Sequence, residues 1–181
     1  MTNLARWSEL AKIPVSPWIG RLRFIAEHIA PGEIVIDVGA GGRSLRSLID
    51  PSCLYIPVDC VRGSPIVFDF NEYDPTPQLN GNVAVMAGFL EYTNNPRSAI
   101  LTVLRWAPRI VLSYAPSIGD DVDARKKSGW VNHFTSERLH QCLSTVAGRV
   151  RQLGEWDGQV IYEIHRFADE STNPTHPGAS L

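Results

Sequence analysis

Ile34-Val35-Ile36-Asp37-Val38-Gly39-Ala40-Gly41-Gly42 is the stretch that decides the fold of this chain. Aliphatic residues lead into Asp37 and then into a glycine cluster, and a helical pattern follows from Arg43. This order predicts a buried strand that ends in a sharp turn over a ligand. Glycine adopts positive φ without steric cost and lets a ligand approach the backbone, and a helix N-terminus beyond it offers unpaired N–H groups to an anion. Asp37, at the carboxyl end of the strand, is therefore expected to contact the ligand.

The spacing of the glycines separates two classes of ligand. The dinucleotide fingerprint G-x-G-x-x-G, counted from Gly39 and Gly41, requires a third glycine at the position of Ser44. An acid two residues before G-x-G-G instead resembles the first motif of class I S-adenosylmethionine (SAM)-dependent methyltransferases. The resemblance implies that this loop binds SAM.

Composition limits the classes of function. The chain has 181 residues, of which 44% are hydrophobic and 20% charged, as expected for one globular domain. The formal net charge of −2 shows no basic excess, which disfavours nucleic acid as a partner. No apolar run reaches the roughly 18–20 residues of a membrane-spanning helix, and the N-terminus lacks a signal-peptide pattern. Cys53, Cys60 and Cys142 contain no C-x-x-C pair. We expect a reduced cytoplasmic protein without a metal site.

Strand and helix patterns alternate along the chain. We expect helices at 16–30, 43–49, 96–106 and 135–147, and strands at 34–38, 54–58, 66–68, 83–87, 109–114, 150–156 and 159–167. The alternation predicts a mostly parallel sheet with helices on both faces. Asp157-Gly158 predicts a hairpin that adds an antiparallel strand.

The segments outside these elements divide the chain further. Residues 1–15 are expected to form an N-terminal lid or arm, 16–168 the main domain and 169–181 a disordered tail. Residues 115–134 are polar and are expected to form an irregular loop with a functional role. The class I methyltransferase fold, an α/β Rossmann-like sheet of seven strands with one antiparallel strand inserted at the edge, has the same arrangement. The resemblance covers about residues 17–167.

Three consecutive strands each end in an acid, namely Asp37, Asp59 and Asp69. The carboxyl ends of parallel strands share one rim, and an acid after the second strand of such a sheet accepts hydrogen bonds from ribose hydroxyls. Asp69-Phe70 resembles the family element that binds the adenine amino group and ring. The alternatives are that each acid only caps a turn, and that Phe70 belongs to the core.

The sequence Gly88-Phe89-Leu90-Glu91-Tyr92 follows the fourth strand and resembles the family's G-x-L-E-H stretch. Tyr92 replaces the histidine, which removes a catalytic histidine at this point but leaves an aromatic ring that can contact a sulfonium. The resemblance thus implies these cofactor contacts: Asp37, Gly39, Ala40, Gly41, Gly42, Asp59, Cys60, Asp69, Phe70, Gly88, Phe89 and Leu90.

Residues for the methyl acceptor are sought in the segment before the last helix. Methyl transfer is an in-line displacement that depends on orientation, and a base is needed only where the acceptor must lose a proton. The run 128–135, with Asn132 and His133, resembles a loop of small-molecule and glycan methyltransferases, which implies His133 as the base and Tyr92 as the second catalytic candidate. The expected acceptor-binding residues are Tyr114, Arg125, Trp130 and Asn132.

Simpler interpretations of this segment stay open. Asn132 and His133 can instead bind backbone groups at a helix start, and Arg125-Lys126-Lys127 can be a solvated loop.

Four functions are compared. The leading hypothesis is a bacterial SAM-dependent methyltransferase acting on an oxygen or nitrogen of a small molecule or saccharide, as a monomer or homodimer, without nucleic-acid or membrane partners. The second is a SAM-binding sensor or scaffold without activity, motivated by Tyr92. Ser44 argues against a nicotinamide-dependent oxidoreductase. Gly88-Phe89-Leu90-Glu91 stands where a DNA amino-methyltransferase would have an N/D-P-P-[FY] tetrad.

Overall fold

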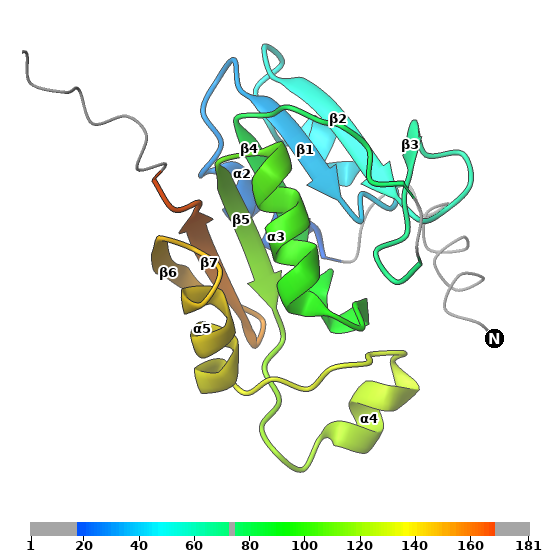
Figure 1. The fold of residues 1–181 in the computed structure, drawn as a ribbon, viewed down its shortest axis with the longest axis vertical. Helices are drawn as coiled ribbons and strands as arrows, with labels where there is room; N and C mark the ends of the chain where they lie inside the picture. Colours follow the sequence, from blue (N-terminus) through cyan, green and yellow to red (C-terminus); the bar gives the residue numbers. More distant parts are fainter. Residues whose placement is uncertain (1–17, 73–74, 169–181) are drawn as a thin grey trace, which may run out of the picture.

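A computed structural model of the chain describes residues 18–72 and 75–168 (Figure 1). The lid or arm expected at 1–15 and the tail expected at 169–181 lie outside the described residues. Within the described ranges, no helix has the length and apolar character needed to cross a membrane.

The described residues form one seven-stranded sheet in the order β3-β2-β1-β4-β5-β7-β6. The strands β1 to β5 are parallel, and β7 runs antiparallel to both of its neighbours, β5 and β6. The fold class expected from the sequence is confirmed. The strands are β1 (Ile34–Val38), β2 (Leu54–Asp59), β3 (Ile66–Val67), β4 (Val83–Ala87), β5 (Arg109–Tyr114), β6 (Arg149–Trp156) and β7 (Gln159–His165).

Helices cover both faces of the sheet. On one face lie α3 (Pro96–Trp106) and α5 (Ser136–Ser144), and on the other lies α2 (Ile19–Ala26) (Figure 1). Successive residues of a strand point to opposite faces, so Ile36 packs in the cluster under α3 and α5 while Val35 packs in the cluster under α2. Both faces of β1 are therefore buried, as the aliphatic residues at 34–36 and 38 predict.

Polar caps fix the starts of the two helices on the first face. The side chain of Asn95 accepts a hydrogen bond from the Ser98 N–H at 3.0 Å, and Pro96 occupies the first turn of α3. Thr135 accepts from the Arg138 N–H at 3.3 Å and begins α5.

The prediction of a helix at 43–49 is wrong. The segment forms a single 3₁₀ turn, η1 (Ser44–Ser47), preceded by Arg43 with φ of 58°. That left-handed conformation cannot belong to an α-helix, so no full helix N-terminus follows the glycine loop. Leu45 and Ile49 are nevertheless buried beside α2, which explains the apolar spacing that predicted a helix.

The loop predicted at 115–134 contains a short helix, α4 (Val122–Lys127). It lies beyond the carboxyl end of β5, apart from the two helical layers (Figure 1). The residue that α4 buries is Arg125. A hydrophobic pattern cannot reveal a helix whose inward side chain is charged, so the sequence indicated only a polar loop.

Candidate functional site

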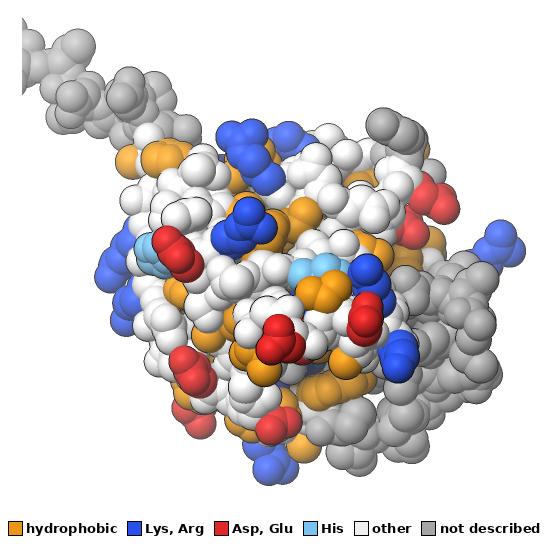
Figure 2. Space-filling model, turned by 90° about the horizontal axis from the view of Figure 1, so that it is seen from below, with side chains coloured by type: hydrophobic (Ala, Val, Ile, Leu, Met, Phe, Trp, Pro, Cys, Tyr) orange, Lys and Arg blue, Asp and Glu red, His pale blue; other side chains and the backbone are white. Residues whose placement is uncertain are grey.

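A pocket of about 230 Å³ lies at the carboxyl ends of the parallel strands. It is lined by the turn after β1, the ends of β2 and β4, the residues after β3, and the starts of α2 and β7. Figure 2 views the molecule from the side to which β5 points; acidic and basic side chains of the described residues are interspersed there. The acids predicted to share one rim, Asp37, Asp59 and Asp69, all line this pocket.

The turn after β1 requires glycine for two reasons. Gly39 has φ of 73° and Gly41 has φ of 50°, values that other residues rarely adopt. A Cβ at Gly39 would lie 2.9 Å from Cδ2 of Phe89. The backbone of the turn therefore approaches the ring of Phe89 closely, and both line the pocket.

Asp59 connects the glycine turn to the loop after β2. Its Oδ2 accepts a hydrogen bond from the Gly41 N–H at 2.8 Å, and its Oδ1 accepts from the Val61 N–H at 3.1 Å. These bonds fix the carboxylate at the pocket wall. Each carboxylate oxygen keeps a second lone pair, so the group can also accept from a pair of neighbouring hydroxyls.

Asp37 is a buried acid, with an exposed fraction of 4%. Its Oδ2 accepts a hydrogen bond from the Tyr55 hydroxyl at 2.5 Å. Burial raises the pKa of Asp37 to about 6, although the bond from Tyr55 works in the opposite direction. At neutral pH this side chain is a carboxylate in a site that disfavours its charge, which suits a cationic ligand group.

An aromatic cluster forms the pocket wall next to Asp69. The ring of Phe70 meets Phe68 and Phe89 edge to face, with centroids 4.7 and 5.0 Å apart. Phe70 both packs against the core and lines the pocket, so the two interpretations of this residue hold together. The carboxylate of Asp69 accepts from the Asn71 N–H at 2.9 Å.

Arg21 of α2 is a buried cation at the other end of the pocket. It is 7% exposed, and its guanidinium donates to the Ala87 carbonyl at 3.1 Å and to Gln159 Oε1 at 2.8 Å. No ion pair involves Arg21 among the described residues, and its Nε has no hydrogen-bond partner there. Burial lowers the pKa of Arg21. A Cβ at Gly88, where φ is 61°, would collide with this guanidinium.

Glu91 is a second buried charge at this end. It is 1% exposed, and its Oε1 accepts from the Ala115 N–H at 2.8 Å. Its Oε2 has no hydrogen-bond partner among the described residues. Burial raises the pKa of Glu91. Glu91 lines the pocket beside Tyr92 and Trp130, and the Trp130 indole N–H donates to the Tyr92 hydroxyl at 2.7 Å.

The chain is similar to known proteins in its fold but not in its sequence. No protein-family model matches the chain, and no curated protein matches it in sequence. Among solved structures, a proposed O-methyltransferase from Nostoc punctiforme PCC 73102 is similar over 88% of this chain, with a TM-score of 0.68 and 11% identity. This chain spans 60% of that protein's length.

This chain spans nearly the whole length of two further solved structures to which it is similar. Magnesium protoporphyrin IX methyltransferase from Synechocystis PCC 6803, with bound S-adenosylhomocysteine (SAH), gives a TM-score of 0.55 at 15% identity, over 90% of this chain and 93% of that one. A protein from Rhodobacter sphaeroides described as a proposed zinc-dependent alcohol dehydrogenase gives 0.62 at 13% identity, over 92% and 100%. The chain has the class I methyltransferase fold. At these identities the likeness shows the fold alone.

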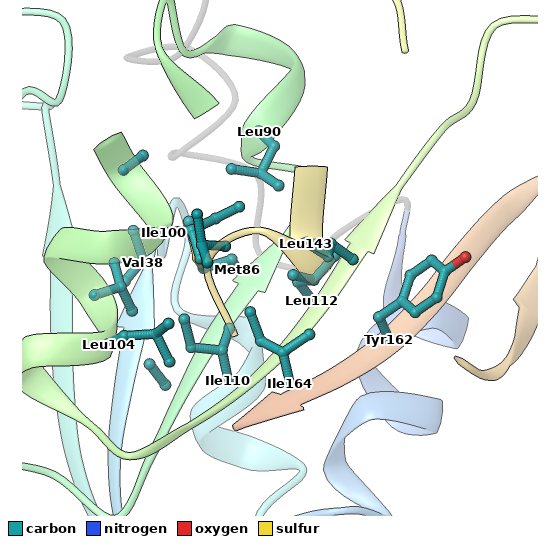
Figure 3. Packing of buried hydrophobic residues seen from close by; sticks show 14 of the residues in the cluster. Val38, Met86, Leu90, Ile100, Leu104, Ile110, Leu112, Leu143, Tyr162 and Ile164 are labelled. Atoms are coloured by element: carbon teal, nitrogen blue, oxygen red, sulfur yellow. The ribbon is translucent and has the colours of Figure 1, made fainter. Parts of the chain in front are cut away.

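Most of the expected cofactor contacts of the class I methyltransferase fold lie together. The pocket is lined by Asp37, Gly39, Ala40, Gly41, Gly42, Asp59, Cys60, Asp69, Phe70, Gly88 and Phe89. Leu90 does not line it, because the turn η2 (Leu90–Tyr92) directs this side chain into the core, where it is fully buried near Met86 and Ile100 (Figure 3).

Of the residues expected for catalysis and acceptor binding, Tyr92 and Trp130 line the pocket. Tyr114 is fully buried in the hydrophobic core, and its hydroxyl donates to Asn132 Oδ1 at 2.6 Å. The Asn132 amide donates to the backbone carbonyls of Leu90 and Thr93. These two residues attach the segment 115–134 to the end of β4 and do not face the pocket.

Arg125 and His133 also lie outside the pocket lining. The Arg125 guanidinium lies 4.5 Å from the centroid of the Trp130 ring, and its Nε–H donates to His133 Nδ1 at 3.2 Å. Arg125 is 2% exposed, so it is not a solvated residue. It positions Trp130, and His133 does not line this pocket.

The lining residues that were not expected from the sequence include Arg21, Glu91 and Gln159. Arg21 lies 66 residues from Ala87 and 138 from Gln159, the residues it contacts. No local motif joins positions so far apart. Glu91 carried a signal, since it is the acid of the G-x-L-E-H resemblance.

Proposed function

We propose that this chain is a SAM-dependent methyltransferase that acts on an oxygen or nitrogen atom of a small molecule or saccharide. The observation that carries the proposal is one pocket in which the glycine turn, Asp59 and the Asp69-Phe70 pair meet. These are the residues that the first three motifs of the family indicate, and they come from three different strand ends.

The charges of the pocket fit the groups of SAM. Asp59 can accept from the ribose hydroxyls, while Asp69 and Phe70 hold the adenine. Asp37, buried and anionic, suits the ammonium of the amino-acid end. Arg21, a buried guanidinium without an ion pair among the described residues, suits its carboxylate. A Cβ at Gly39 or Gly88 would collide with Phe89 or Arg21, so both glycines are needed for this shape of the pocket wall.

The chain's role in the reaction is orientation. SAM, when bound, supplies an electrophilic methyl carbon on a sulfonium whose departure requires no proton. The pocket walls align an acceptor atom with that carbon and exclude water, and alignment alone can supply a large part of the rate enhancement. Trp130 and Tyr92, joined by their hydrogen bond, close the end of the pocket over β4.

Isothermal titration calorimetry with SAM and SAH tests the proposal. We expect both ligands to bind, and Asp59→Asn to lower both affinities at least about tenfold, since each lost charge-assisted hydrogen bond is worth about 1.5–3 kcal/mol. Asp120→Asn, an exposed acid outside the pocket, should leave the affinities unchanged. Absence of binding by a chain that circular dichroism shows to be folded would refute the proposal.

A second function, a SAM sensor or scaffold, is favoured by one observation. The described residues that line the pocket include no histidine, because Tyr92 stands in the motif position and His133 is bound to Arg125. Incubation with SAM and a panel of phenols, amines and sugars separates the two functions. Release of SAH that depends on one acceptor class excludes a purely sensory role.

A further inference from the structure

The strand order divides the pocket into two halves. The half over β3, β2 and β1 carries Asp69, Asp59 and the glycine turn. The half over β4, β5 and β7 carries Glu91 and Gln159, with Arg21 and Trp130. In the proposed function the adenosyl group occupies the first half. The methyl group therefore points to the second half, which is where an acceptor binds.

Glu91 has unused hydrogen-bonding capacity in the second half, as has Nε of Arg21, the residue that the proposed function assigns to the carboxylate of SAM. Oε1 of Glu91 is fixed by the Ala115 N–H at 2.8 Å, so the direction of the carboxylate is set. Its Oε2 has no partner among the described residues although the side chain is 1% exposed. Leaving a buried charged oxygen without a donor is unfavourable. A donor supplied by a ligand removes this cost.

The other charges of this region have partners once SAM is considered. Arg125 pairs with Asp121, Nη1 to Oδ2 at 3.5 Å. Arg21 and Asp37 are assigned to the carboxylate and ammonium of SAM. Arg21 and Arg125 act on the Glu91 carboxylate electrostatically, but Oε2 has no hydrogen-bond donor among the described residues, which points to a cationic or N–H-bearing acceptor.

Aromatic side chains line the same half. Trp18, Tyr92 and Trp130 contribute to the pocket wall. Indole and phenol rings attract cations over their faces and bury apolar groups. The wall thus suits a molecule with an apolar body and one amine.

We propose that the acceptor is an amine with an apolar or aromatic body, whose N–H is bound by Oε2 of Glu91. The inference rests on the proposed function and names its substrate class. Glu91 first accepts a proton from the bound ammonium, and the raised pKa of this buried carboxyl favours the acceptance. The nitrogen lone pair that is freed forms the C–N bond as the C–S bond breaks and its electrons pass to sulfur.

Calorimetry on the full chain saturated with SAH tests this inference with three probes that share one skeleton: phenethylamine, phenethyl alcohol and phenylacetate. We expect phenethylamine to bind best and phenylacetate worst. Glu91→Gln should weaken phenethylamine by about tenfold or more, the loss of one charge-assisted hydrogen bond, and leave SAH affinity unchanged. Glu155→Gln, an exposed glutamate outside the pocket, is the matched control.

Each other outcome has a defined meaning. Preference for phenylacetate, or equal phenethylamine affinity in Glu91→Gln, overturns the inference. If Glu91→Gln weakens SAM but not SAH, Glu91 serves the sulfonium and the inference is again overturned. If folded wild-type chain binds no SAH, the proposed function fails first and the inference with it. If Glu91→Gln does not fold, the order of the three probes on the wild-type chain decides.

Discussion

At the level of single residues, Asp37 couples ligand binding to a cost in stability. Its folded-state pKa of about 6 lies above the ordinary value of 3.8, so the folded chain holds this proton more tightly than the unfolded chain. The contribution of Asp37 to stability is therefore fully present below pH 4 and is lost as pH rises through 6. Asp37→Asn should raise the free energy of unfolding at pH 7 by about 1–3 kcal/mol, since one pKa unit is worth about 1.4 kcal/mol, and should abolish SAM binding.

Urea denaturation of both proteins between pH 4 and pH 8 measures this effect. The stability difference between Asp37→Asn and wild type should grow as the pH rises through 6. The comparison of two proteins cancels other titrating groups, including Glu91. A difference that stays constant across this range would show that Asp37 is ionised without cost in the folded state.

Gly39 allows a second test at this level. Gly39→Ala meets both a left-handed φ of 73° and a contact of 2.9 Å with Phe89. We expect a loss of about 1–3 kcal/mol in the free energy of unfolding and at least about tenfold weaker SAM binding, because the turn must move. Gly32→Ala has a similar φ of 78° with nothing within 4 Å, and Gly32 lies outside the pocket. It should lose stability but retain SAM affinity, as measured by calorimetry.

At the level of elements, α4 depends on one buried cation. Arg125 contacts Trp130, His133 and Asp121 from a 2% exposed position. Arg125→Ala should lower the free energy of unfolding by about 2–4 kcal/mol, because it removes a buried side chain and the hydrogen bonds it donates to His133 and to the buried Tyr114 hydroxyl. Lys126→Ala, its exposed neighbour, should change stability by less than about 0.5 kcal/mol. Equal effects of the two substitutions in urea denaturation would contradict the positioning role of Arg125.

The elements also show what sequence can predict. The bounds of β1, β4, α3 and β5 were predicted as the structure has them, because each is a continuous apolar or amphipathic run. The turn η1 was predicted as a helix because Leu45 and Ile49 have an apolar spacing, which does not reveal the left-handed Arg43. The helix α4 was missed because the residue it buries, Arg125, is charged. The spacing of apolar residues in a sequence shows which side chains are expected to be buried. It does not show the backbone conformation of a single residue or the burial of a charged side chain.

The residues of the pocket likewise separate into those that the sequence predicts and those that it does not. The half of the pocket over β1 to β3 was predicted, because the glycine turn, Asp59 and Asp69 are each read from a few adjacent residues. In its half over β4 to β7, Gly88, Phe89, Tyr92 and Trp130 were predicted and line the pocket. Arg21 and Gln159 were not predicted, because they meet only when α2 docks on the hairpin of β6 and β7. The expected base, His133, was placed by motif resemblance alone, and the packing of Arg125 holds it elsewhere.

At the level of the whole molecule, α2 and the sheet together form the end of the pocket that is assigned to the amino-acid part of SAM. Arg21→Met keeps the length and packing of the side chain but removes the charge. Because burial disfavours the Arg21 charge more than the nearby Glu91 and Asp37 favour it, the free variant should melt at the same temperature as wild type or above it.

Ligand-induced shifts in melting temperature isolate the contribution of Arg21. A ligand at about 100 times its Kd stabilises the folded chain by about 2.7 kcal/mol. SAH should raise the wild-type melting temperature more than methylthioadenosine, which lacks the amino-acid end, and this difference should vanish in Arg21→Met. Arg23→Met, an exposed position of the same helix, should preserve the difference. If Arg21→Met retains the full difference, the carboxylate of SAM binds elsewhere, and Arg21 is then free to recognise an anionic group of the acceptor.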